Sequence, residues 1–213
     1  MRILITGFEP FGADAENASQ SAVDLLADRW SHESVQLLTG ILPVEFGRAG
    51  TALHELVARY RPDAVIAVGE AGGRSRVTPE ARGVNEMDAR IADNAGLQPR
   101  SEAIFPAGPA ERPATLDVQA LADAADAAGV PAEVSEDAGR FVCNYVAYLL
   151  GGFDAPAAFV HVPAVRSAGT ATVGGETDAV RALAVDSSDP VLGFDDLATA
   201  LEAIALDAAR QVG

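Results

Sequence analysis

Short apolar runs alternate along this chain with longer segments in which apolar residues recur every three or four positions. The short runs are typical of strands, and the longer segments are typical of amphipathic helices. The strand-like runs lie at residues 2–8, 35–42, 63–69, 132–135 and 157–162. The helical segments lie at residues 17–30, 46–60, 115–128, 140–150 and 194–211. This alternation predicts an α/β fold, a three-layer sandwich with a mostly parallel twisted sheet and helices on both faces.

The pattern also indicates where a functional site would lie. No internal repeat and no linker divides the chain, so residues 1–213 are expected to form one domain. In open α/β sheets, sites gather at the carboxyl ends of the strands. The segments at such ends are "GFEPFG" (7–12), "GEAGGR" (69–74), the turn at 135–143 and the residues from His161 onward. Residues 74–114 are rich in polar and turn residues, and residues 166–178 are expected to be a mobile loop; either segment is long enough to cover a site.

Composition narrows the classes of function. The 213 residues are 49% hydrophobic and 22% charged, which is ordinary for a globular protein. The formal net charge of −16 argues against a nucleic-acid partner, because a phosphate backbone is met by clustered positive charge. All fifteen basic residues are arginine, so a Walker lysine and a Schiff-base lysine are both excluded. No apolar run approaches the length of a membrane span, and the first residues lack the pattern of a signal peptide.

Cys143 is the only cysteine of the chain. No intrachain disulfide is therefore possible, which fits a cytoplasmic protein. A lone cysteine is commonly a small buried hydrophobe, and core packing is one interpretation here. However, the helical pattern begins at this residue, after the polar segment "SEDAGR". The first turn of a helix stabilises a thiolate and offers backbone N–H groups to an oxyanion, so a nucleophilic role is the second interpretation.

A nucleophilic thiol needs a base, and the chain has three histidines. His32 lies in a polar turn and His54 on a helix, so both are expected at the surface. His161 instead lies at the end of the apolar run "AAFV", where a catalytic base or a buried core histidine would both fit. Three scattered histidines and one thiol form no ligand-spaced cluster, so neither a metal nor a cofactor is expected. Spacing does not identify the carboxylate that would orient the histidine, because the chain has 31 acidic residues.

Four blocks of sequence together resemble the pyroglutamyl peptidase I family, also called pyrrolidone carboxyl peptidases. They are "ILITGFEPFG" near the N-terminus, "GEAGGRSRVTPEARGVNEMDARIADNAGLQP" (69–99), "AGRFVCNYVAY" (138–148) and "FVHVP" (159–163). The blocks follow the family's order and span roughly residues 2–163. The resemblance implies a cysteine exopeptidase that removes N-terminal pyroglutamate from peptides, and a possible homodimer or homotetramer.

The resemblance also implies the roles of individual residues. Cys143 matches the family's nucleophile, His161 its base and Glu80 of "TPEAR" its acidic residue. Arg90 of "DARI" matches an arginine close to the site. The positions that match the pocket for the five-membered lactam are Phe8, Phe11, Asn17, Ile91, Phe141 and Val142. A small neutral lactam suits such an apolar pocket with a few placed hydrogen bonds.

The chain departs from the family at Glu70, where the family has glutamine. An ionised glutamate offers only acceptors, whereas glutamine offers a donor as well. We expect Glu70 to accept the lactam N–H; the alternative is that it points outward or is protonated. A charged carboxylate without a partner beside a neutral ring is unfavourable, and Arg74 and Arg90 are the candidate partners.

Two other functions stay open on the sequence. The chain is a binding protein for a lactam or a peptide terminus, in which Cys143 only packs. Alternatively it is a related hydrolase whose pocket accepts a different N-terminal residue, as the change at Glu70 allows.

Overall fold

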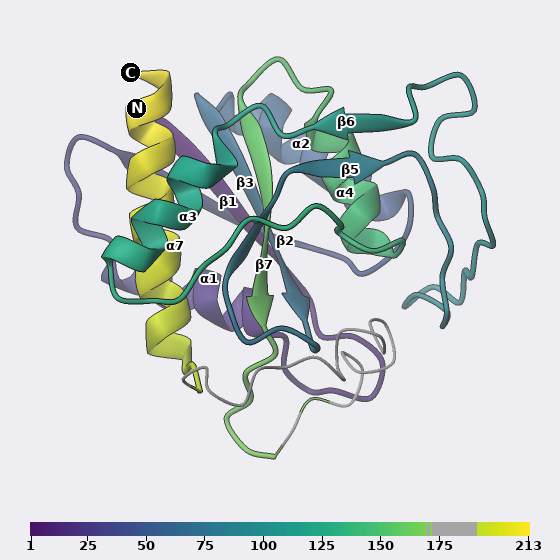
Figure 1. The fold of residues 1–213 in the computed structure, drawn as a ribbon, viewed down its shortest axis with the longest axis horizontal. Coiled ribbons are helices and arrows are strands. Elements are labelled where there is room, and N and C mark those ends of the chain that lie inside the picture. The colour runs from purple at the N-terminus through teal and green to yellow at the C-terminus, as the bar shows by residue number, and fades with distance from the viewer. Residues whose placement is uncertain (170, 172–190) are drawn as a thin grey trace.

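A computed structural model describes residues 1–169, 171 and 191–213 of the chain. Its main sheet has five strands in the order β2-β1-β3-β7-β4, and all neighbours are parallel except the pair β7 and β4 (Figure 1). These strands are β1 (Arg2–Phe8), β2 (Gln36–Leu42), β3 (Ala64–Ala71), β4 (Thr78–Glu80) and β7 (Ala157–Pro163). The predicted fold class, a mostly parallel α/β sheet, is confirmed.

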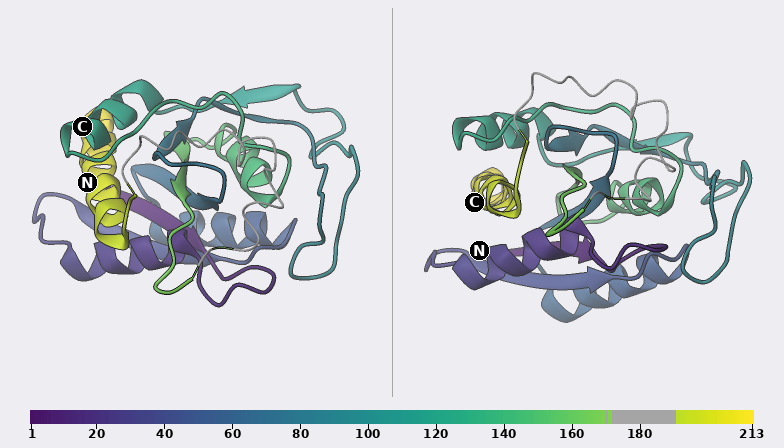
Figure 2. Two further views of the ribbon diagram at one scale, coloured as in Figure 1. Left: turned by 60° about the horizontal axis from the view of Figure 1, so that its bottom comes forward. Right: turned by 90° about the horizontal axis from the view of Figure 1, so that it is seen from below.

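Helices cover both faces of this sheet. The helices α1, α3 and α7 pack on one face, and α2 and α4 on the other; Figure 2 shows the same separation from two further sides. Their bounds are α1 (Ala18–Arg29), α2 (Arg48–Tyr60), α3 (Val118–Ala127), α4 (Val142–Leu150) and α7 (Phe194–Val212). Each lies within or close to a segment for which the periodicity predicts a helix. Within the described residues, no helix combines the length and the apolar character needed to cross a membrane.

The strand β3 shows how the two layers of core meet. Its residues 64–69 are all buried, because its side chains alternate between the two faces of the sheet and helices cover both faces. Ile66 and Val68 join the core beneath α1 and α7, while Val65 and Ala67 join the core beneath α2 and α4. The unbroken apolar run is therefore the signature of a strand buried on both faces, as predicted.

The prediction of a strand at residues 132–135 is wrong. Ala132 and Ser135 form only isolated bridges, to Val77 and Glu80. The edge of the sheet is instead formed by β4, which has three residues and pairs antiparallel with β7. On its outer side, β4 exchanges backbone hydrogen bonds with the segment 131–135, and Pro79 accepts one from the N–H of Ser135 at 2.9 Å. Pro79 has no N–H to donate in return, so it interrupts the pairing on that side.

Residues 74–114 are also more ordered than a covering loop. They contain β4 and a separate two-stranded sheet of β5 (Arg82–Val84) and β6 (Glu111–Pro113). The sheet of β5 and β6 lies beside α4 (Figure 1). Its two strands have three residues each, too few to show the alternation of apolar and polar residues by which a strand is predicted. Of the predicted mobile loop 166–178, residues 166–169 and 171 are described, and the others lie outside the described residues.

Candidate active site

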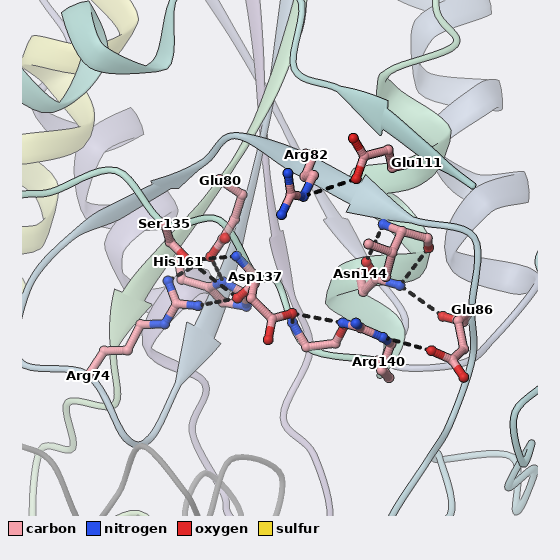
Figure 3. Close-up of polar contacts among 12 residues, drawn as sticks. Arg74, Glu80, Arg82, Glu86, Glu111, Ser135, Asp137, Arg140, Asn144 and His161 are labelled. Atoms are coloured by element: carbon pink, nitrogen blue, oxygen red, sulfur yellow. Dashed lines mark hydrogen bonds and ion pairs between the residues drawn. The ribbon is translucent and has the colours of Figure 1, made fainter. Parts of the chain in front are cut away.

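His161 lies at the carboxyl end of β7, with only 4% of its surface exposed. Its Nδ1 is 2.7 Å from Oε1 of Glu80, which lies on the neighbouring strand β4 (Figure 3). The antiparallel register pairs Thr78 with His161, which brings the edge strand and its carboxylate to this end of the sheet. Because Glu80 holds Nδ1, the other ring nitrogen, Nε2, is the one that can exchange a proton with a thiol.

Arg74 completes the support of this pair. Its Nη1 is 2.6 Å from Oε1 of Glu80, and its Nη2 donates to the carbonyl of Asp137 at 2.9 Å (Figure 3). Burial of Glu80 opposes ionisation, but the hydrogen bond from His161 and the charges of His161 and Arg74 outweigh it. Together they hold the pKa of Glu80 below its ordinary value. Arg74 was a candidate ion-pair partner of Glu70, and this prediction is wrong, since Arg74 forms its ion pair with Glu80.

The thiol of Cys143 lies on the same face of the sheet as His161. The helix α4 begins at Val142, so Cys143 is in its first turn, as predicted. A Cβ placed on Gly69 would lie 2.8 Å from the Sγ of Cys143 and 2.7 Å from the ring of Phe159. Gly69 is directly opposite His161 in the register of β3 and β7. Since neighbouring strands are only about 5 Å apart, the absent side chain of Gly69 leaves the thiol room beside the imidazole.

Asn144, the residue after the cysteine, fixes the position of this helix. It is fully buried and exchanges hydrogen bonds of 2.8 and 2.9 Å with the backbone of Val84 on β5. It also donates to the carbonyl of Glu86 at 2.9 Å (Figure 3). These bonds pin the first turn of α4 against β5. The sequence gives no sign of this role, because a buried asparagine on a helix carries no distinctive spacing.

The stabilisation of a thiolate expected from the first turn of the helix is outweighed. Burial, together with the negative charges of Glu80 and Glu70, raises the pKa of Cys143 to about 12. The charge of Arg74 and the backbone N–H of Cys143 act in the opposite direction but do not prevail. The resting state is therefore a protonated thiol, and a base must remove its proton as it reacts.

The thiol and the imidazole open into one cavity of about 120 Å³. The rings of Phe11 and Phe141 contact each other in its lining, tilted with centroids 5.1 Å apart, and Phe8 and Val142 complete an apolar wall. Phe141 is the N-cap residue of α4, and its side chain accepts no hydrogen bond from the helix. The N–H groups of the first turn are therefore not occupied by a capping side chain. Such groups suit a developing oxyanion.

Of the other residues expected in the pocket besides Glu70, one lines the cavity and two do not. Asn17 lines the cavity, but it also caps α1: its Oδ1 accepts from the N–H of Ser19 and its Nδ2 donates to the carbonyl of Glu9. Ile91 and Arg90 are not among the described residues that line the cavity, and Arg90 is exposed. The structure therefore does not place Ile91 or Arg90 in the pocket of this chain.

Glu70 lines the cavity as expected, but its partner is Arg166. The two guanidinium Nη atoms bind the two carboxylate oxygens at 2.6 and 2.7 Å. Arg166 also binds Asp14 at 2.8 Å. Neither Arg166 nor Asp14 was expected in the site, since Arg166 follows a proline-bearing strand end in a segment without apolar periodicity.

Comparison with known proteins agrees with this geometry. The family model described as pyroglutamyl peptidase matches residues 1–188. The pyrrolidone-carboxylate peptidase of Streptomyces coelicolor is 45% identical over 168 residues, which cover 76% of this chain and 77% of that protein. That of Clavibacter michiganensis is 38% identical over 207 residues, covering 95% and 90% of the two chains.

Solved structures show the same likeness. The crystal structure of Bacillus amyloliquefaciens pyroglutamyl peptidase I superposes with a TM-score of 0.82 at 32% identity, covering 99% of this chain and 98% of that one. A mutant pyrrolidone carboxyl peptidase from Pyrococcus furiosus also has a TM-score of 0.82, at 30% identity over the full length of both chains. Fold, sequence and site together show that this chain belongs to the pyroglutamyl peptidase family of cysteine peptidases.

Proposed function

We propose that this chain removes an N-terminal pyroglutamyl residue from peptides, with Cys143 as nucleophile, His161 as general base and acid, and Glu80 as the residue that orients His161. The observation that carries the proposal is the bond of 2.7 Å between Nδ1 of His161 and the buried carboxylate of Glu80, in the cavity that also contains Cys143. In such an arrangement the thiol acts as the nucleophile, the imidazole as the base, and the carboxylate orients the imidazole. Family membership supplies the substrate class.

The first half of the reaction forms an acyl-enzyme. As the thiol of Cys143 attacks the carbonyl carbon of the pyroglutamyl residue, Nε2 of His161 takes the thiol proton. The thiolate thus forms only with substrate in place, in keeping with the raised pKa of the resting thiol. The oxyanion of the tetrahedral intermediate accepts hydrogen bonds from first-turn N–H groups of α4. His161 then gives its proton to the leaving amine.

The second half releases the product. A water molecule loses a proton to His161 and attacks the thioester carbonyl, and the proton returns to the sulfur as the thiol leaves. Glu80 stays ionised throughout, because Arg74 and His161 stabilise its charge. The aromatic wall of Phe8, Phe11 and Phe141 receives the lactam ring, with Asn17, Glu70 and Val142 around it.

The remaining assignments follow from this proposal. We treat residues 1–213 as one catalytic domain, since β1 at the N-terminal end lies inside the main sheet and α7 at the C-terminal end packs on that sheet. A single nucleophilic cysteine suits a reducing compartment, so we place the enzyme in the cytoplasm. A homodimer or homotetramer stays a prediction that light scattering tests.

The test compares two substrates of equal ring size. We expect hydrolysis of pyroglutamyl-aminomethylcoumarin and little hydrolysis of prolyl-aminomethylcoumarin, and we expect Cys143→Ala to abolish both. Binding of the pyroglutamyl compound without turnover would instead show a binding protein. Preferential hydrolysis of the prolyl compound would show a peptidase of altered specificity.

A further inference from the structure

Three of the charged side chains in the lining of the catalytic cavity form one buried cluster and take no part in the proposed proton transfers. They are Asp14, Glu70 and Arg166, and their side chains are only 9%, 10% and 6% exposed. They come from three separate places in the chain: the segment between β1 and α1, the end of β3, and the segment after β7. Burial of three charges is costly unless each is paired and hydrogen-bonded.

The carboxylate of Glu70 is fully engaged. Arg166 binds it with both terminal nitrogens, Nη1 to Oε2 at 2.6 Å and Nη2 to Oε1 at 2.7 Å. Oε2 also accepts the backbone N–H of Ala18 at 2.6 Å, at the first residue of α1. A two-point contact with a guanidinium and a third bond at a helix N-terminus are strong interactions for a carboxylate. Each oxygen of Glu70 therefore already has a donor.

Without Arg166 the same carboxylate would change the cavity in two ways. It would offer an unneutralised negative charge that binds the ammonium group of an ordinary peptide N-terminus. Its charge would also act more strongly on Cys143, whose pKa the negative charge of Glu70 already raises. Arg166 opposes both effects, because its positive charge occupies the carboxylate and repels a second cation.

We propose that Arg166 is a specificity-determining residue: by engaging Glu70 it makes the cavity select a neutral lactam and reject the charged amine of an ordinary N-terminal residue. The inference rests on the proposed function for the identity of the lactam. The pyroglutamyl ring carries no charge at its nitrogen, whereas a prolyl ring of the same size carries an ammonium. Discrimination between these two rings is thus a discrimination by charge.

The test measures occupancy of the cavity separately from turnover. L-pyroglutamamide and L-prolinamide are compared as ligands that protect Cys143 from iodoacetamide, which reports binding even if nothing is hydrolysed. For the wild type, we expect protection by the lactam only. For Arg166→Met, we expect protection by prolinamide to improve by about tenfold or more, because a buried carboxylate has lost its counter-charge. We also expect slower alkylation at a given pH.

Two further variants separate specificity from simple loosening of the cavity. Glu70→Gln combined with Arg166→Met removes both charges, and we expect it to restore rejection of prolinamide and the wild-type alkylation rate. Asp14→Asn removes the charge of the second carboxylate that binds Arg166 but leaves Glu70 engaged, and we expect it to keep the wild-type preference between the two ligands. Arg210→Met, at an exposed ion pair on α7, is the matched control for loss of an arginine.

The inference is overturned if Arg166→Met leaves the ligand preference unchanged, or if the double variant is as altered as Arg166→Met alone. Failure of the wild type to hydrolyse pyroglutamyl-aminomethylcoumarin is a different result: it would overturn the proposed function, while the protection assay would still decide the role of Arg166.

Discussion

The Sγ of Cys143 occupies the space that a side chain at Gly69 would fill. A Cβ at Gly69 would lie 2.8 Å from this sulfur, closer than real Cβ contacts allow. Gly69 has an ordinary extended backbone on β3, so glycine is not needed here for an unusual backbone conformation. Its missing side chain instead allows α4 to pack close to the strand. The register places His161 opposite this glycine, and the thiol and the imidazole line the same cavity.

Replacement of Gly69 by alanine is expected to displace the thiol while the sheet still forms. A shift of about 1 Å in a reacting group costs on the order of a hundredfold in rate, so we expect kcat/KM for the pyroglutamyl substrate to fall by about that factor. Gly193→Ala is the control, since a Cβ there meets its first neighbour at 3.7 Å. Steady-state kinetics of both variants measure the loss of kcat/KM, and thermal unfolding shows whether the fold is retained. Full activity of Gly69→Ala would contradict the placement of the sulfur.

His161 and Glu80 are expected to differ in the size of their effects. His161→Ala removes the group that moves protons, and general acid–base catalysis contributes about 10² to 10⁴-fold. Glu80→Gln retains a hydrogen-bonding side chain and should cost less, because the acid orients the base and does not itself transfer protons. The readout is kcat/KM, with its pH profile. Negligible losses for both variants would remove them from the mechanism.

The other two histidines are the matched controls for this comparison. His32 binds Glu202 at 2.6 Å, and the ring of His54 packs on Phe153 with centroids 4.8 Å apart. Neither is among the described residues that line the cavity. We expect His32→Ala and His54→Ala to keep the wild-type kcat/KM.

The raised pKa of Cys143 predicts the pH dependence of its alkylation. Only the thiolate reacts with iodoacetamide, and far below its pKa a thiol gains about tenfold in thiolate for each pH unit. With a pKa of about 12, the alkylation rate of the ligand-free protein should keep rising through pH 10. Because the chain has a single cysteine, mass spectrometry follows one site. A plateau below pH 8 would instead show a resting thiolate paired with protonated His161.

Local sequence determined much of this protein. Apolar periodicity is a property of neighbouring residues, so it located the long strands and helices: the predicted helix 140–150 contains α4, and the predicted strand 157–162 ends one residue before β7 does. In a parallel sheet the carboxyl ends of the strands share one edge, and this rule placed His161 at the site. The same rule placed Cys143 there through the predicted strand 132–135, which does not form; the thiol reaches the site from the first turn of α4. The resemblance added Glu80 and the aromatic wall of Phe8 and Phe11, all of which the structure brings to this end of the sheet.

Only the tertiary structure decided which charges meet. Glu80 lies on a three-residue strand, too short to show a period, and it meets His161 because β4 pairs with β7. Arg74 reaches the same carboxylate from the segment between β3 and β4. Arg166 is 96 residues from Glu70, and no local pattern selects one among fifteen arginines as its partner. The pKa of Cys143 likewise depends on burial and on charges brought in by other strands, which overcome the stabilising effect of its helix turn. Pairing of charges and desolvation are properties of the packed chain, and for that reason the sequence indicated the reacting residues but not the electrostatics that govern them.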